Sequence, residues 1–265
     1  MASRTPKDIQ KIGAEIRRLV VEMSYRSRSG ETGSSLSISD LLAVLYFKTL
    51  RINPKKPSDP GRDRFILSKG HGAAALYATL ALRGFFPQKT LLDHRVNGGV
   101  FHAHPSKGAA PGIEVSTGAL GHGLSIGVGM AYALKDTKSK VYVLIGDGEC
   151  NEGSIWEAVL AAGALRLSNI VAIVDENKFQ GFGASEENNP FDAVKQWSSF
   201  GWDALRVDGH DTAAIEKALA EATGAAKPFV IIADTVSGKG VPAIENTLGA
   251  HYYVPDAQAV AAMKL

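Results

Sequence analysis

Asp147 and Asn177 are the side chains whose types and spacing most clearly indicate chemistry. Asp147 follows the apolar run 141–145 after one glycine, and Asn177 follows a second apolar run, 170–174. Both runs are rich in β-branched residues, which predicts buried strands. The Ala- and Leu-rich stretch 154–167 between them has a helical period, so the segment predicts one strand–helix–strand unit.

These two side chains are 30 positions apart in the sequence, yet such a unit should place them side by side. Parallel strands joined by a helix end at the same edge of the sheet. Open parallel sheets bind ligands at that carboxyl edge. A carboxylate, an amide oxygen and a nearby backbone carbonyl are hard oxygen donors, which suit a Mg²⁺ ion that also binds a phosphorylated ligand.

The glycines on either side of Asp147 fit the same interpretation. Gly146 allows a tight turn, and Gly148 lets backbone N–H groups approach an anion without a β-carbon in the way. A Gly-Asp-Gly turn alone is usually an ordinary turn and helix cap, but its spacing to Asn177 favours a site. A dinucleotide fingerprint would need a third glycine at position 151, which is Asn, and the chain has no GxxxxGK[ST] phosphate loop.

Composition limits the classes of protein to consider. The chain has 265 residues, 45% of them hydrophobic, which is enough for one sizeable core. Its net charge of +2 does not favour a nucleic-acid surface. Cys150 is the single cysteine, which excludes an intrachain disulfide framework. No apolar run is long enough for a membrane span and the N-terminus lacks a secretory pattern, so a cytoplasmic location is expected.

Hydrophobic periodicity predicts strands that alternate with helices. This alternation indicates an α/β three-layer sandwich with a mainly parallel sheet covered on both faces. Ser37 is a plausible cap for the second helix. The glycine-rich stretch 98–125, which lacks periodicity, and the polar stretch 181–189 are expected to be loops, and the first is long enough to suggest a functional role. The expected helices cover 8–28, 37–50, 73–82, 122–134, 154–167 and 212–223, and the expected strands cover 64–67, 141–145, 170–174, 202–207 and 229–235.

At this level the sequence resembles the thiamine diphosphate enzymes and, within them, the transketolases. The family motif is a Gly-Asp-Gly turn followed, after about thirty residues, by an Asn that closes a short acidic or amide pair; here it reads GDGECNEG and VDENKF. SKGHGAAALY, HPSKGAAPGIEVSTGALGHGLS, VDGHD and SGKGVPAIEN are each similar to a transketolase segment, in the family order. The resemblance implies one diphosphate-type thiamine diphosphate-binding domain over residues 1–265, with a helical N-terminal segment.

The resemblance also implies which residues hold the cofactor. Asp147, Asn177 and the backbone carbonyl of Phe179 would bind Mg²⁺, or Ca²⁺ or Mn²⁺ in its place. Glu176 stands where many relatives have Asn or Asp and is not expected to be a ligand. The expected cofactor-binding residues are Gly146, Asp147, Gly148, Glu149 and Asn177 around the diphosphate, Gly118, Ala119 and Leu120 under the aminopyrimidine ring, and His71 and His251.

Three of the seven histidines match family histidines expected to be catalytic. His71 would face cofactor and substrate, His104 would meet the substrate hydroxyls, and His251 would lie near the diphosphate and the reacting carbon. A histidine with a near-neutral pKa suits moving a proton on and off sugar hydroxyls at pH 7. The run AHYYVP around His251 departs from the usual WHGKAP-like run. The others are interpreted more plainly: His94 and His210 as surface or packing residues, His102 as structural, and His122 as either cofactor-adjacent or structural.

One position departs from the family pattern. The early family segment reads like SGHxGxxLS, whereas residues 29–37 are SGETGSSLS, so Glu31 replaces a histidine that reaches the first carbons of the sugar. A carboxylate cannot donate a hydrogen bond as an imidazolium does. The donor is therefore expected to differ from the usual ketose phosphate, or a partner compensates.

A second α/β domain is expected on another chain. In this family it carries the glutamate that contacts the pyrimidine and the residues that bind the substrate phosphate. The chain is expected either to be truncated or, as its resemblance to separately encoded N-terminal subunits favours, to form a hetero-tetramer with a separately encoded C-terminal subunit. Glu152 and Glu157 would then lie near the subunit interface, or else on a solvated helix face.

The resulting functional hypothesis is transfer of a two-carbon glycolaldehyde unit from a ketose phosphate to an aldose phosphate through thiamine diphosphate. One alternative is the alpha subunit of a 2-oxo acid decarboxylase or dehydrogenase with the same cofactor; His71 and His104 speak against it, because a 2-oxo acid needs fewer proton shuttles. Another alternative is a non-catalytic assembly subunit, which only Glu31 supports.

Overall fold

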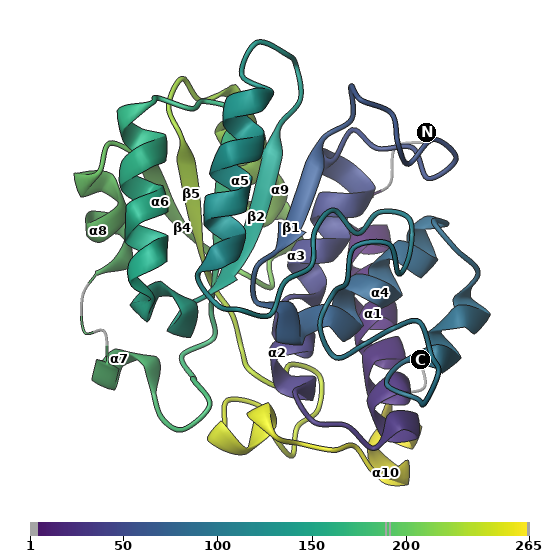
Figure 1. The fold of residues 1–265 in the computed structure, drawn as a ribbon. Helices are drawn as coiled ribbons and strands as arrows, with labels where there is room; N and C mark the ends of the chain where they lie inside the picture. Colours follow the sequence, from purple (N-terminus) through teal and green to yellow (C-terminus); the bar gives the residue numbers. More distant parts are fainter. Residues whose placement is uncertain (1–4, 189, 191, 264–265) are drawn as a thin grey trace.

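The fold is built on one fully parallel sheet (Figure 1). The computed structural model describes residues 5–188, 190 and 192–263. The strands run in the order β1-β2-β3-β5-β4, so the central neighbours β2 and β3 are the two strands predicted to carry the site. The strands are β1 (Arg64–Leu67), β2 (Val141–Gly146), β3 (Ile170–Glu176), β4 (Asp203–Asp208) and β5 (Phe229–Asp234).

Each central strand buries side chains on both faces of the sheet. In β2, Tyr142 and Leu144 belong to one core cluster, whereas Val141, Val143 and Ile145 belong to the other. This two-residue alternation is the geometry of an extended strand, and burial on both faces is why the run reads as continuously apolar. The sheet is therefore the middle of three layers.

Helices cover both faces, which confirms the predicted three-layer α/β architecture (Figure 1). One face packs against α5 (His122–Ala133), α6 (Gly153–Ala164) and α8 (Ala193–Ser199). The other core cluster includes α1 (Pro6–Ser27), α3 (Ser39–Val44), α4 (Ala73–Arg83) and α9 (Thr212–Gly224). The connection from β3 to the edge strand β4 contains α8, and the connection from β4 back to β5 contains α9. These two connections run in opposite directions across the sheet. Because crossovers between parallel strands are right-handed, they place α8 and α9 on opposite faces.

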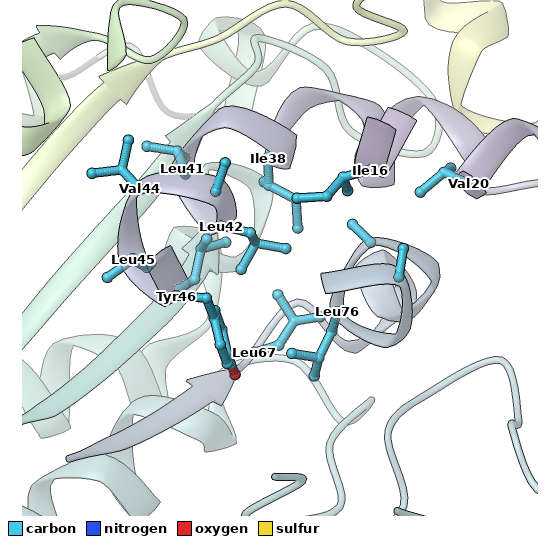
Figure 2. Close-up of a cluster of buried hydrophobic side chains, with 14 of the residues drawn as sticks. Ile16, Val20, Ile38, Leu41, Leu42, Val44, Leu45, Tyr46, Leu67 and Leu76 are labelled. Atoms are coloured by element: carbon cyan, nitrogen blue, oxygen red, sulfur yellow. The ribbon is translucent and has the colours of Figure 1, made fainter. Parts of the chain in front are cut away.

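The N-terminal helices pack tightly around the end of β1. Figure 2 shows side chains from α1, α4, the end of β1 and the segment 38–46, which contains α3, gathered in one cluster: Ile16, Val20, Ile38, Leu41, Leu42, Val44, Leu45, Tyr46, Leu67 and Leu76. Burying each such side chain contributes roughly 1.5–3 kcal/mol. The cluster fixes the position where β1 ends, and the segment 68–71 leads from there to the site.

The expected helix 37–50 is divided in the structure. The range covers the last residue of α2 (Thr32–Ser37), all of α3 and a single π-helical turn over Leu45–Thr49. The prediction that Ser37 caps a helix was wrong, because Ser37 is the last residue of α2 and Ile38 precedes α3. The buried Ser37 hydroxyl donates to the Asp175 carboxylate (2.9 Å) and to the Ser34 carbonyl (3.1 Å).

Other differences lie at element ends and in short helices. The predicted helix 154–167 ends at Ala164, and Arg166 then adopts a left-handed backbone with φ 50°. The expected loop 181–189 contains the short helix α7 (Ser185–Asn188), while Asn189 lies outside the described residues. Neither α8 nor α10 (Ala257–Ala262) was predicted. No helix within the described residues is both long and apolar enough to cross a bilayer.

Candidate functional site

A cavity of about 560 Å³ opens at the carboxyl edge of the sheet. Gly146 of β2 pairs in register with Asp175 of β3, so the residues that follow these strands are neighbours. The Lys178 N–H donates to the Asp147 carboxylate (2.8 Å), which joins Asp147 to the residue directly after Asn177. Asp147 and Asn177 both line the cavity, which confirms the predicted juxtaposition.

The Asp147 carboxylate is held by three donors. Besides Lys178 N–H, it accepts from the Gly148 N–H (2.8 Å) and the Ser185 hydroxyl (2.8 Å). Burial, followed by the nearby charge of Asp175, raises the pKa of Asp147 to about 6. A bound cation would favour the ionised carboxylate and so act against both effects.

Asn177 is oriented by hydrogen bonds at both ends of its amide. Its Oδ1 accepts from the Phe179 N–H (3.1 Å), and its Nδ2 donates to the Asp175 carboxylate (2.8 Å). No group of three His, Cys, Asp or Glu side chains that could hold a metal occurs among the described residues. The available donors at Asp147, Asn177 and the Phe179 backbone are instead the mixed hard-oxygen set that fits Mg²⁺.

The glycine turn leaves room for an anion beside an unpaired donor. A β-carbon on Gly148 would lie 2.9 Å from Cγ of Gln180, so a larger residue would crowd this wall of the cavity. The Gln180 Nε2 is buried and has no hydrogen-bond partner among the described residues. An unsatisfied buried donor costs about 1–3 kcal/mol, which a phosphate oxygen could offset. Both observations fit a diphosphate group. Sequence reasoning missed Gln180, which lies in an irregular segment without periodicity.

The loop expected under the aminopyrimidine ring reaches the cavity through one side chain. Leu120 lines the cavity and is 36% exposed, whereas Gly118, Ala119 and His104 lie outside its lining. Gly118 has φ 138°, and a β-carbon there would lie 3.1 Å from the His104 ring. Glycine is therefore required both by backbone conformation and by the close approach of His104.

The side chain of Glu149 has a structural role. Its carboxylate is 2% exposed and accepts from the Gly121 N–H (2.8 Å), the Gly146 N–H (3.2 Å) and the Ser68 hydroxyl. It thus ties together the segments that follow β1 and β2 and the loop before α5. The carboxylate is committed to these bonds, so the expected cofactor contact of Glu149 stays a prediction for its backbone alone.

His71 and His251 meet in the cavity, with ring centroids 5.8 Å apart. Burial, followed by the charge of Lys69, lowers the pKa of His71 to about 3. Burial also lowers the pKa of His251. The expectation of a near-neutral pKa was therefore wrong for His71, and the pKa of His251 lies below its ordinary value. At pH 7 each ring is neutral, with one nitrogen that donates and one that accepts.

We expect the imidazole of His71 to stay neutral in the folded chain from pH 8 to pH 5. Folded His71 binds a proton only near pH 3 instead of its usual 6.5, so between these values the unfolded chain binds the extra proton. Stability therefore falls as pH drops below about 6.5 through this residue. The ring ¹⁵N shifts of His71 should be constant over the range and should titrate in urea; a folded-state titration near pH 6.5 would contradict the prediction. His71→Gln should remove this part of the pH dependence of urea unfolding.

A buried ion pair lies beside the cavity, which is lined by its lysine, Lys69. The Lys69 ammonium pairs with Asp175, and their side chains are 1% and 0% exposed. Burial acts to raise the pKa of Asp175, but the charge of Lys69 and hydrogen bonds from Lys69, Thr235 and Asn177 outweigh it and lower that pKa. Sequence reasoning missed this pair, although Lys69 follows the end of β1 at the same sheet edge. Ser34 was also missed and lines the cavity.

Several residues are placed away from the candidate chemistry. His94 is 4% exposed and packs edge-on against Tyr77, and burial lowers its pKa to about 4, which confirms a packing role. His210 accepts from the Val236 N–H (2.9 Å) and pairs with Asp40 through its other ring nitrogen (2.9 Å), so it belongs to a structural network. His102 and His122 are exposed. The Glu176 carboxylate pairs with Arg206. Burial raises the pKa of the Cys150 thiol.

The fold and these contacts define a class of protein: an α/β domain with a cavity at the carboxyl edge of a parallel sheet, whose oxygen and N–H donors suit a metal ion and a diphosphate. Residues 9–265 match the family described as transketolase, thiamine diphosphate binding domain. The chain therefore belongs to the transketolase family.

Named relatives agree with this assignment. The chain is 42% identical over 248 residues to the 6-deoxy-6-sulfo-D-fructose transketolase subunit of Clostridium sp., covering 92% of this chain and 90% of the relative. It is 42% identical over 246 residues to an apulose-4-phosphate transketolase subunit from Phocaeicola vulgatus, covering 91% and 87%. The solved transketolase from Leishmania mexicana matches with a TM-score of 0.93 and 30% identity, covering 100% of this chain and 41% of that one.

Proposed function

We propose that this chain is the diphosphate-binding subunit of a transketolase-type enzyme that moves a two-carbon glycolaldehyde unit from a ketose phosphate to an aldose phosphate. The observation that carries the proposal is the juxtaposition of Asp147 and Asn177 above a glycine turn in one cavity. Membership of the transketolase family supports the same conclusion. The cofactors would be thiamine diphosphate and Mg²⁺, with Ca²⁺ or Mn²⁺ as substitutes.

The described residues divide the work of binding. Asp147, Asn177 and the Phe179 carbonyl would hold the cation, while Gly148 and Gln180 would receive the diphosphate oxygens. When bound, thiamine diphosphate supplies the carbon nucleophile and the electron sink. The chain's own contribution is to orient it and to exclude water.

Proton handling would fall to the histidines. His71 and His251, both neutral at pH 7, can hold a hydroxyl by donating from one nitrogen and accepting at the other. His104 lies close enough for its charge to influence His71, which is consistent with its expected contact to substrate hydroxyls. These roles stay predictions, as does a role for Gly118 and Ala119 beneath the pyrimidine ring.

We further propose that residues 1–265 form one domain and that the pyrimidine-binding domain belongs to a separately encoded partner. Support comes from relatives named as subunits, which match this chain over most of their own length. A hetero-tetramer with active sites at the interface is the expected assembly. Placement of Glu152 and Glu157 near that interface and a cytoplasmic location also stay predictions.

The purified chain should be inactive alone and should gain activity when its cognate C-terminal subunit is added, because the residues expected to activate the pyrimidine lie on that partner. Turnover of xylulose 5-phosphate with ribose 5-phosphate, and separately of pyruvate, would be measured with each chain by itself and with the pair. Robust activity of the single chain would contradict the split enzyme. Turnover of pyruvate without sugar transfer would favour the decarboxylase alternative.

Glu31, which departs from the family pattern, lies beside His251. The Glu31 N–H donates to the His251 carbonyl (2.8 Å), and its carboxylate pairs with Arg95 (3.2 Å). The family histidine is thus replaced by an acid that already has a cationic partner. We propose that this pair alters donor recognition, so the donor screen should include ketoses other than xylulose 5-phosphate. The relatives from Clostridium and Phocaeicola are themselves named for different sugars.

A further inference from the structure

Asp175 collects hydrogen bonds from four segments of the chain. One oxygen accepts from the Thr235 hydroxyl (2.5 Å). The other accepts from the Lys69 ammonium, the Ser37 hydroxyl (2.9 Å) and the Asn177 amide nitrogen (2.8 Å). Thr235 follows β5 and Lys69 follows β1, so the carboxylate is fixed from both sides of β3. Such a carboxylate cannot turn without breaking several bonds at once.

The amide of Asn177 has two orientations of nearly identical shape. In the observed one, Nδ2 faces the Asp175 carboxylate and Oδ1 faces the Phe179 N–H. Rotation by half a turn would set an amide oxygen against a carboxylate oxygen and an amide N–H₂ against a backbone N–H. An ionised carboxylate only accepts hydrogen bonds, so both contacts of the rotated amide would be repulsive.

We propose that Asp175, anchored by Lys69, is a positioning residue that locks Asn177 with its amide oxygen available to the cation. The role rests on the proposed function, because it supposes that Asn177 is a metal ligand. Lys69 compensates the buried charge of Asp175. It also fixes the position of the Asp175 oxygen that accepts from the Asn177 amide. Groups that orient metal ligands in this way typically change metal affinity by about 10–100-fold when removed.

A charge-free variant separates this role from general stability. In Lys69→Met/Asp175→Leu, both charges and the acceptor for Asn177 are absent, and replacing a buried ion pair by apolar residues of similar size is often tolerated. Thr235→Val is the matched control, because it removes a donor to the other Asp175 oxygen and leaves the contact with Asn177 intact. Circular dichroism would establish that each variant is folded.

Mn²⁺ is a suitable probe for the cation site. The electron paramagnetic resonance signal of free Mn²⁺, titrated into the full chain with saturating thiamine diphosphate, should show about 10–100-fold weaker binding in Lys69→Met/Asp175→Leu and no change in Thr235→Val. A second readout does not depend on the cofactor. The Asn177 side-chain amide protons, assigned by their loss in Asn177→Asp, should be protected from exchange in the wild type and in Thr235→Val, and unprotected in the double variant.

The outcomes distinguish the two proposals. A wild-type chain that binds no Mn²⁺ with thiamine diphosphate would overturn the proposed function and the positioning role with it. Wild-type binding accompanied by equal affinity and equal amide protection in Lys69→Met/Asp175→Leu would overturn the positioning role alone. Weaker binding in the double variant together with loss of amide protection would support it, because a merely structural change would not act selectively on the Asn177 amide.

Discussion

Replacing Asp147 by alanine is expected to weaken metal-dependent binding of thiamine diphosphate by at least one order of magnitude. The change removes the only carboxylate of the candidate ligand set and leaves the donors from Lys178 and Ser185 without their acceptor. Truncating one partner of a buried charge pair costs roughly 2–5 kcal/mol or more. Because each 1.4 kcal/mol is a factor of ten, affinity should fall by about 30-fold to more than 1,000-fold. Calorimetric titration of thiamine diphosphate into the chain with saturating Mg²⁺ measures this loss.

Two further variants make the Asp147 experiment specific. Asp147→Asn keeps an oxygen donor and the side-chain shape but removes the charge, so its affinity should be intermediate. Glu176→Gln removes a neighbouring acid whose carboxylate is occupied by Arg206, and it should bind as the wild type does. Mg²⁺-dependent binding at wild-type affinity in a folded Asp147→Ala chain would refute the ligand assignment. An equal loss in Glu176→Gln would show that general negative charge, and not a specific ligand, attracts the cation.

Replacing Lys69 by methionine should destabilise the chain by about 3–5 kcal/mol, because it leaves a buried carboxylate without its counter-charge. The pair is almost fully excluded from solvent, so water cannot compensate for the lost ammonium. Urea unfolding followed by circular dichroism gives the free energy of unfolding. Lys69→Met/Asp175→Asn should recover most of the loss, since it removes the unpaired charge. Its amide oxygen can accept from one of the hydroxyls of Ser37 and Thr235, and its amide N–H₂ can donate to the oxygen of the other.

The matched control for Lys69 is a lysine in a surface ion pair. Lys227 pairs with Asp203 at 3.5 Å with its side chain 58% exposed. Exposed pairs contribute about 0–1 kcal/mol, so Lys227→Met should have little effect on unfolding. A Lys69→Met chain as stable as the wild type, or equal losses for both lysines, would contradict the assignment of Lys69 and Asp175 as a buried structural pair.

The parts of the site that could be predicted from sequence depend on the periodicity of short segments and on how the chain connects them. Val141 to Ile145 and Ile170 to Val174 are β-branched runs joined by a helical stretch, and chain geometry then requires their carboxyl ends to be neighbours. Adjacent placement of Asp147 and Asn177 needs no knowledge of the rest of the fold. The face of α1 that packs on the core was likewise readable from its helical period.

The parts that could not be predicted depend on which segments meet. Ser37 was expected to cap a helix because nothing in its neighbourhood reveals that a buried carboxylate 138 positions away accepts its hydroxyl. Glu149 lines the cavity, and its carboxylate also accepts from the Gly121 N–H, 28 positions earlier in the chain, a contact that periodicity does not reveal. Both contacts join segments that are distant in the chain.

The sequence by itself determined the α/β class, the strand–helix–strand unit and the pair Asp147 and Asn177, because these depend on periodicity and chain connectivity. Only the tertiary structure decided that Lys69 pairs with Asp175 beside the cavity, that the Gln180 amide presents a donor to which no described residue bonds, and that His71 is neutral at pH 7. Burial and the approach of charged groups control these properties. Both arise when separate segments pack together, so no local pattern of residues encodes them.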